Sequence, residues 1–209
     1  MQPSAVFRTN MKRLYLIIIL IFNLKSAKAD YESIRLPQLI SNSSLILRGK
    51  IEKVDSLNII VKIQAQLKGT FTDSIIIISK FSDWTCAARF DNYSEGQKLI
   101  FFLKKGVKSY LILGAGNEGE MPIIDNKVYY KQLYLKIDQN PIEYKVYNGN
   151  LKGYEYNLNQ FESAIIYYIK NSESIIKAIL KDRNFNLTSM KNQTIDRIIS
   201  ELRDQYYSE

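Results

Sequence analysis

Few side chains in this sequence could perform catalysis. It contains no histidine and a single cysteine, Cys86, among 209 residues. A Ser-His-Asp triad, a Cys-His dyad and a zinc site with histidine ligands all need an imidazole group. The sequence excludes these three kinds of site, and no spacing singles out two carboxylates as a catalytic pair. We therefore predict no catalytic residue, and we favour a protein that is not an enzyme.

Three roles are open for Cys86. It could be a small buried side chain, a partner in an intermolecular disulfide bond, or a reactive thiol. Its neighbours Trp84 and Ala87 are apolar, and Arg89 is the nearby cation that could stabilise a thiolate. We therefore expect Cys86 to be buried.

Residues 114–119 read Gly-Ala-Gly-Asn-Glu-Gly, which matches the glycine pattern of dinucleotide-binding loops. Such a loop must open a helix whose N-terminal amides hold a pyrophosphate, but Pro122 follows at once. The carboxylates of Glu118 and Glu120 would also repel phosphate. We therefore interpret this segment as a loop between two strands, in which the glycines adopt positive φ angles.

The same segment is rich in oxygen-bearing side chains, which are the ligands that calcium accepts. These side chains are Asn117, Glu118, Glu120, Asp125 and Asn126. Their spacing is not that of an EF-hand, and loops are commonly acidic because they are solvated. We therefore predict no metal and no other cofactor, and we keep Asn117, Glu118 and Glu120 as candidate ligand-binding residues of the loop.

Seven of the fifteen tyrosines lie between residues 129 and 156, interleaved with lysines. An exposed tyrosine offers a flat apolar ring and a hydroxyl group, which suit stacking against bases or sugar rings. The candidate residues of this tyrosine-rich face are Tyr129, Tyr130, Tyr134, Tyr144 and Tyr147. The alternative, which we favour, is that about half of the tyrosines fill the core as strand residues and that the lysines form a solvated face.

The N-terminal segment has the layout of a secretory signal peptide. Its parts are the basic Met11-Lys12-Arg13, the apolar run 14–24 and the small residues of Ala27-Lys28-Ala29. The apolar run is about half as long as the roughly 20 residues that a membrane-spanning helix requires. We therefore expect translation to start at Met11, residues 1–29 to be removed, and the protein to be secreted or periplasmic without a membrane anchor.

Removal of this leader would also remove most of the net charge. The full chain has 29 basic and 21 acidic residues, which give a net charge of +8. Residues 1–29 hold five basic residues and no acidic one, so the mature chain keeps a net charge of only +3. A charge this small gives little general attraction to nucleic acids or anionic membranes. We therefore expect no nucleic-acid partner.

Seven segments show the pattern of β-strands, either by alternation of apolar and polar residues or as short β-branched and aromatic runs between turn formers. They are residues 45–54, 58–67, 75–78, 99–103, 110–113, 128–137 and 142–147. We expect 75–78, 99–103 and 110–113 to be covered on both faces. The number and close spacing of the segments predict a closed or sandwich-like β core.

The apolar period changes to 3.6 residues beyond Gly153. Asn159 and Glu162 have the spacing of a capping box, and apolar residues then recur at helical spacing as far as Leu180. A second helical pattern runs from Ile195 to Tyr206. Because both helices are amphipathic, we expect them to pack on the β core; the alternative is a partner-binding helix.

Four features together resemble bacterial secreted proteins of the netrin-like superfamily, which includes the tissue inhibitors of metalloproteinases. They are Ser44-Leu45-Ile46-Leu47-Arg48-Gly49-Lys50-Ile51, the strand ending at Leu67-Lys68-Gly69, Cys86, and the run from Gly96 to Leu103. The resemblance covers roughly residues 42–115 and implies an OB-type five-stranded barrel. We thus expect an α+β fold, a mainly antiparallel OB-like β-barrel over residues 30–156 with amphipathic C-terminal helices at 157–209 packed on it.

The resemblance transfers no functional residue. The inhibitors of this superfamily chelate zinc through an N-terminal cysteine, whereas the first residue expected here is Asp30, and their multiple disulfides are absent. We therefore expect an exported, non-catalytic binding module that recognises a protein or an extracellular polymer such as a glycan. The alternative is an exported, histidine-independent enzyme or a protein resembling a protease inhibitor.

Overall fold

The structure is a computed structural model that describes residues 32–83, 87–116, 118–138, 140–187 and 191–207. The chain divides into two units, residues 1–32 and 33–209, and the description below concerns the second. The expected signal peptide lies outside the described residues, and so do Cys86 and Asn117.

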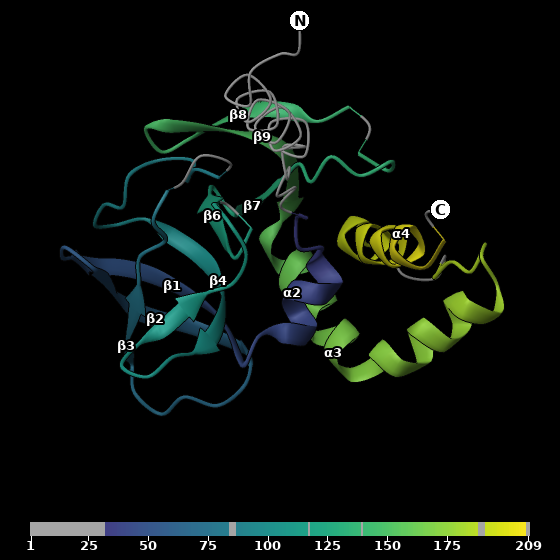
Figure 1. Cartoon of the computed structure of the whole chain (residues 1–209), viewed down its shortest axis with the longest axis horizontal. Coiled ribbons are helices and arrows are strands. Elements are labelled where there is room, and N and C mark those ends of the chain that lie inside the picture. Colours follow the sequence, from purple (N-terminus) through teal and green to yellow (C-terminus); the bar gives the residue numbers. More distant parts are fainter. Residues whose placement is uncertain (1–31, 84–86, 117, 139, 188–190, 208–209) are drawn as a thin grey trace, which may run out of the picture. The chain divides into compact units, whose positions relative to one another are not determined.

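Five strands close into a barrel (Figure 1). They are β1 (Leu45–Val54), β2 (Asn58–Lys68), β3 (Ile75–Ser79), β4 (Lys98–Lys105) and β5 (Tyr110–Ile112). Their order is β1-β2-β3-β5-β4, and β4 pairs again with β1 to complete the ring. All pairings are antiparallel except that of β3 with β5, which is parallel. The predicted α+β fold with an OB-like barrel is confirmed.

Four further strands extend the sheet from β4 in the order β6-β7-β9-β8. They are β6 (Glu120–Ile124), β7 (Lys127–Lys131), β8 (Ile142–Val146) and β9 (Gly149–Asn157). The sequence did not predict β6 or β9. The strand predicted at 128–137 ends at Lys131, and Tyr134 beyond it has a positive φ of 60°. β7 and β9 approach closely at Gly153, where an added Cβ would lie 2.0 Å from the Tyr130 carbonyl oxygen.

The described residues form three helices: α2 (Leu36–Asn42), α3 (Leu158–Lys181) and α4 (Gln193–Tyr207). α3 begins two residues earlier than the predicted capping box, because the Asn157 side chain accepts hydrogen bonds from the amides of Asn159 and Gln160. The other residue of that predicted box, Glu162, instead forms an ion pair with Arg48 at 3.4 Å. None of the helices in the described ranges is both long and apolar enough to cross a membrane.

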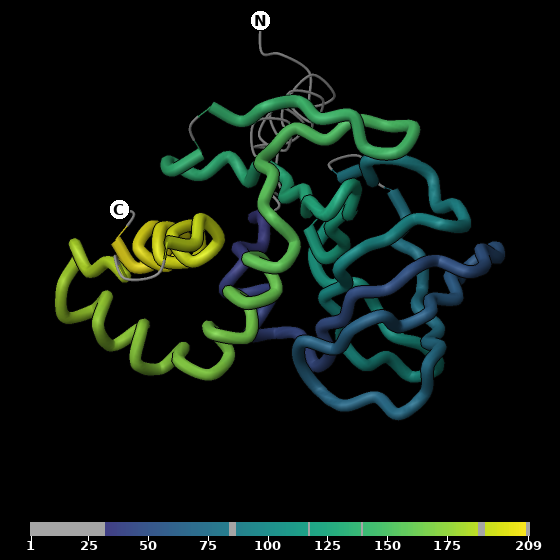
Figure 2. The backbone as a smooth tube through the Cα atoms, turned by 180° about the vertical axis from the view of Figure 1, so that it is seen from behind, coloured from purple at the N-terminus to yellow at the C-terminus, as the bar shows by residue number. Residues whose placement is uncertain are grey.

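The core has two parts, one on each side of β4. Leu99, Phe101 and Leu103 point into the barrel, whereas Ile100 and Phe102 point toward the helices. Figure 2 shows α2 and α4 beside α3, and all three helices lie on one side of the barrel. The helices pack on the sheet as predicted, and we call this the helix side.

The strands far from the helices are covered on one face only. The prediction of coverage on both faces is therefore confirmed for 99–103 but wrong for 75–78 and 110–113. In β3, Ile76 and Ile78 are buried inside the barrel, whereas Ile75 and Ile77 are about half exposed on its outer surface. The helices do not reach this part of the barrel (Figure 1).

Candidate functional site

The five tyrosines predicted to form a binding face do not share one exposed surface. Tyr129 and Tyr130 are neighbours in β7 and point in opposite directions, so Tyr129 is buried on the barrel side and Tyr130 on the helix side. The Tyr144 ring packs on Tyr129, with 5.1 Å between ring centroids. These placements agree with the interpretation in which tyrosines of this region fill the core as strand residues.

The other two candidates differ from one another. Tyr134 is well exposed on the connection between β7 and β8. Tyr147 lies in the tight turn between β8 and β9, and its hydroxyl donates to the carbonyl oxygens of Lys98 and Ile123 at 2.9 and 3.0 Å. It also accepts a hydrogen bond from the Lys98 amide at 2.7 Å. Tyr147 therefore ties the β8–β9 hairpin to the strands β4 and β6.

Part of the tyrosine cluster lines a shallow cavity of about 350 Å³ between the β8–β9 hairpin and α4. Tyr144, Tyr154 and Tyr156 contribute to it, and Arg197 of α4 closes one side. The Arg197 guanidinium lies 4.8 Å from the centre of the Tyr154 ring, within the range of a cation–π interaction. Two of these three tyrosines, Tyr154 and Tyr156, were not among the predicted binding residues.

The glycine-rich loop connects two strands, as predicted. It joins β5 to β6, and Gly114 and Gly116 have positive φ angles of 76° and 59°. The expectation that its acidic residues are solvated is wrong, because Glu118 and Glu120 are both fully buried. The Glu118 carboxylate accepts a hydrogen bond from the Ala115 amide at 2.9 Å, which holds the loop closed on itself.

Glu120 belongs to a buried ion pair at the start of β6. Its Oε1 lies 3.0 Å from Nε of Arg89 and accepts a hydrogen bond from the Tyr93 hydroxyl at 2.8 Å. Arg89 also donates to Gln97 Oε1 at 3.1 Å, and its guanidinium stacks over Phe90 and Tyr93. Burial raises the pKa of the Glu120 carboxyl, while Arg89 opposes the increase. The cluster fixes the β3–β4 connection to β6.

A second buried network joins α4 to the sheet and to α2. Arg197 contacts Glu201 Oε1 through Nε and Asp138 Oδ1 through Nη2, both at 2.5 Å. Glu201 also accepts hydrogen bonds from the Tyr130 hydroxyl at 2.9 Å and the Leu36 amide at 2.6 Å. Burial raises the pKa of the Glu201 carboxyl against the opposing effect of Arg197.

This network was not predicted, although the sequence contains a signal of it. Arg197 and Glu201 are four residues apart on the helix face that carries Ile198 and Leu202. Two opposite charges at that spacing within an apolar face indicate a buried pair, because isolated charges are rarely buried. Within the described ranges, no group of three or more His, Cys, Asp or Glu side chains could hold a metal ion.

A cavity of about 530 Å³ lies between the barrel and the start of α3. Arg48, Lys98 and Asp125 contribute charges of both signs to its lining. Arg48 is already paired with Glu162. This mixed lining contains no cluster of titratable groups that converges on one point, so it does not indicate a catalytic site.

The outer surface of β3 and β5 carries an unusual concentration of exposed aliphatic side chains. They are Leu57 (73% exposed), Ile75 (51%), Ile77 (50%) and Leu111 (47%), together with the fully exposed Val107. We call these five residues the aliphatic face. Ser79 of β3 pairs with Leu111, so the strand residues of the face point outward on adjoining strands.

This face shares β3 and two loops with the position at which OB-type barrels bind their ligands. That position consists of the outer surface of the second and third strands with the β1–β2 and β4–β5 loops. Here Leu57 lies in the β1–β2 loop and Val107 in the β4–β5 loop, one at each end of the face. The sequence analysis missed it, because four consecutive isoleucines at 75–78 do not reveal which of them faces outward.

The pairing that joins β3 to β5 is short beside this face. β5 pairs with β3 only at Ile78 and Ser79, and no other described strand pairs with residues 75–77 on that edge. A cavity of about 300 Å³ lies between residues 75–77 and the β4–β5 loop. The backbone edge of β3 therefore borders an open cleft.

Lysines surround the cleft and the aliphatic face. Lys105 and Lys108 line the cleft, where Asp73 is the acidic residue of the lining. Lys62 and Lys104 are exposed on the adjoining strands, and Lys62 pairs with Ile75 while Lys104 pairs with Leu111. The surroundings of the aliphatic face are therefore positively charged.

No family profile and no curated protein matches this chain. Among solved structures, it is similar to a crystal structure provisionally assigned as an exosome complex RNA-binding protein, with a TM-score of 0.25 and 16% sequence identity. The similarity covers 79% of this chain and 97% of that chain. The expectation of no nucleic-acid partner is contradicted by this comparison, and we withdraw it. A TM-score of 0.25 carries no argument about the ligand of this chain.

Proposed function

We propose that this protein is an exported, non-catalytic interaction module that binds an extended, acidic segment of a partner protein. The segment would lie along the open edge of β3 and pack its apolar side chains against the aliphatic face. The observation that carries the proposal is the presence of exposed isoleucines directly beside an unpaired strand edge.

The aliphatic face supplies the apolar part of the interaction. Single exposed apolar residues are common on protein surfaces, but a contiguous group of them marks an interaction site. Ile75, Ile77 and Leu111 lie on adjoining strands and retain about half of their exposure. Complete burial of one such side chain stabilises a complex by about 1 kcal/mol, since full burial from water contributes roughly 1.5–3 kcal/mol.

The open edge of β3 supplies the directional part. An extended peptide that adds to a strand edge forms main-chain hydrogen bonds, and alternate side chains enter pockets on the receptor. The cleft beside residues 75–77 lies at the required place, between this edge and the β4–β5 loop. Its lining includes Phe71 and Tyr110, whose rings pack edge to face and form an apolar floor.

The lysines indicate which charge the partner segment should carry. Lys62, Lys104, Lys105 and Lys108 would attract an acidic segment and suit it better than a basic one. Because these side chains are exposed, salt screens their attraction over about 8–10 Å at physiological ionic strength. Binding should therefore weaken as the salt concentration increases.

Export of the protein and its place among netrin-like proteins are parts of the same proposal. The basic, apolar and small-residue zones of residues 11–29 support removal of a leader during export. The five-stranded barrel is the architecture that the netrin-like resemblance implies, which supports that relationship at the level of fold. Intact mass of the protein recovered outside the cytoplasm tests export, with Asp30 expected as the first residue.

Selection of a random dodecapeptide library displayed on phage tests the binding proposal. With residues 30–209 as the target, we expect enriched peptides that alternate aliphatic and acidic residues. Ile77→Glu should weaken the binding of such a peptide at least tenfold in fluorescence anisotropy. The matched control is Ile142→Glu, because Ile142 is also an isoleucine of a strand and is 60% exposed.

Three results would contradict the proposal. The first is a selection that enriches no peptide, and the second is an enriched peptide whose affinity is the same for Ile77→Glu as for the unchanged protein. The third is binding of a single-stranded RNA oligonucleotide that Ile77→Glu abolishes, since this would assign the face to another class of partner.

A further inference from the structure

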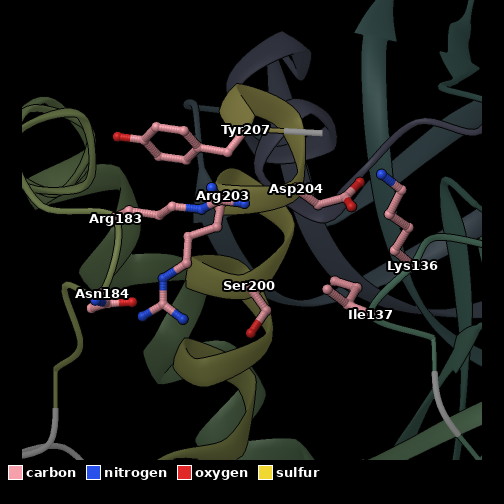
Figure 3. Close-up of a pocket in the computed structure, with 8 residues that line it drawn as sticks. All are labelled: Lys136, Ile137, Arg183, Asn184, Ser200, Arg203, Asp204 and Tyr207. Carbon is pink, nitrogen blue, oxygen red and sulfur yellow. The ribbon is translucent and has the colours of Figure 1, made fainter. Parts of the chain in front are cut away.

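The face of α4 that carries Arg197 and Glu201 is not its only notable face. Another face of this helix borders a groove of about 330 Å³ on the helix side of the protein. Ser200, Arg203, Asp204 and Tyr207 follow one another at the spacing of a single helix face and form its floor. Lys136 and Arg183 approach from the two sides of α4, as Figure 3 shows. The groove shares no residue with the aliphatic face.

The charges that line this groove are mostly positive. Lys136, Arg183 and Arg203 contribute three cations, and Asp204 contributes the one carboxylate of the lining. Asp204 is also paired with Arg35 at 2.9 Å, so its charge is shared with a cation outside the lining. The groove therefore has an excess of positive charge, which would attract an anion.

The two arginines are held in place by the protein itself. Arg203 donates through Nη2 to the carbonyl oxygen of Phe185, and Arg183 stacks over the Tyr207 ring at 5.2 Å. The Tyr207 hydroxyl in turn donates to the Ile179 carbonyl oxygen at 2.9 Å. A guanidinium group has five N–H donors, so these contacts orient each arginine and leave donors for a ligand.

One donor of the Arg203 guanidinium points away from solvent. Its Nε is inaccessible to solvent and has no hydrogen-bond partner among the described residues. A buried donor without a partner costs about 1–3 kcal/mol. In Figure 3 the Arg203 side chain extends from α4 toward the level of Asn184, and both residues line the groove.

We propose that this groove binds a small molecule through an oxyanion, either a phosphate or a carboxylate group. Arg203 and Arg183 hold the oxyanion through charge-assisted hydrogen bonds, and Lys136 adds a point charge from the other side of α4. The Ser200 hydroxyl and the Asn184 amide provide neutral hydrogen bonds to the rest of the molecule.

The test uses pyrophosphate and citrate as separate probes, with sodium chloride at the same ionic strength as the reference. We expect one of them to increase the thermal unfolding midpoint with saturable dependence on its concentration, and calorimetry to give a matching dissociation constant. Pyrophosphate alone would identify phosphate compounds as the ligand class, and citrate alone would identify carboxylates. A cation near a helix end can stabilise the helix without any ligand, so replacing it can lower the unfolding midpoint directly. Variants are therefore compared by the increase in midpoint that the anion causes in each of them.

Variants then locate the site. Arg183→Gln should weaken binding of the active probe at least tenfold, and the fold should persist because Arg183 is exposed. Lys170→Gln is the control, since Lys170 is an exposed lysine of α3 outside the groove and its loss changes the net charge equally. The proposal is overturned if neither probe exceeds sodium chloride, or if Arg183→Gln and Lys170→Gln have the same effect.

Discussion

The helix side and the β3–β5 side of the same barrel differ in what covers them. On the helix side, Phe102 and Ile100 of β4 are fully buried in a cluster that includes residues of all three helices. On the β3–β5 side, Ile77 and Leu111 occupy equivalent outward positions, and no described helix packs on them. The barrel interior is closed in both regions. The difference therefore indicates that the first surface stabilises the fold, whereas outward residues of the second stay exposed to solvent.

The largest effect that this comparison predicts is on stability. Phe102→Ala should lower the free energy of unfolding by about 3–5 kcal/mol, because it removes a buried ring between β4 and the helices. Leu111→Ala on the other side should lower it by less than about 1 kcal/mol, because Leu111 is half exposed. Urea denaturation of the two variants measures both values. Similar losses would show that the β3–β5 side is as important to the fold as the helix side.

An intermediate effect concerns the ion network under the helices. Arg197→Gln should lower the free energy of unfolding by about 1–3 kcal/mol, since Glu201 and Asp138 stay buried without their shared cation. The matched control is Lys177→Gln, which removes an exposed cation at the same four-residue spacing from its partner Glu173. We expect little change for the control, because exposed ion pairs contribute little. An equally small change for Arg197→Gln would show that the network does not stabilise the helix side.

The smallest effect is a dependence on pH. Burial raises the pKa values of Glu120 and Glu201 in the folded protein above those in the unfolded chain. Between the folded pKa values and the unfolded value near 4.5, the folded protein therefore binds more protons than the unfolded chain. The free energy of unfolding increases as pH decreases through this range, and this gain is lost as pH increases through the folded pKa values. We expect the free energy of unfolding to increase by about 1 kcal/mol for each unit of pKa shift upon acidification from pH 8. Denaturation at several pH values measures it, and Glu120→Gln should reduce the slope.

A slope that Glu120→Gln leaves unchanged would contradict this assignment. Asp55 supplies the internal reference, because backbone hydrogen bonds from Asn58 and Leu57 lower its pKa in the exposed β1–β2 loop. Its contribution is therefore lost only at more acidic pH, below the range in which Glu120 and Glu201 act.

Local patterns in the sequence predicted the regular parts of the fold. Alternation along β2 and the 3.6-residue period of α3 and α4 were sufficient, because each element buries one face. β6 is short, includes Pro122 and follows a glycine-rich loop, so it has the composition of a turn. α2 has only seven residues, which is too short for a helical period to become visible.

The candidate site was less accessible to such patterns, because it depends on pairings between distant residues. Glu120 is buried against Arg89, which is 31 residues away in the chain, and nothing near Glu120 reveals that partner. Similarly, the exposure of Ile75 and Ile77 depends on where the helices lie. α3 and α4 begin 81 or more residues after Ile77, and α2 ends at Asn42, before β1. Sequence period predicts faces within an element, but it does not predict which face another element covers.

The link between α2 and α4 has a consequence for biosynthesis. The Leu36 amide and the Arg35 side chain bind Glu201 and Asp204, which are 165 and 169 residues further along the chain. These contacts form only after the ribosome has synthesised the chain as far as Asp204, and such long-range contacts slow folding.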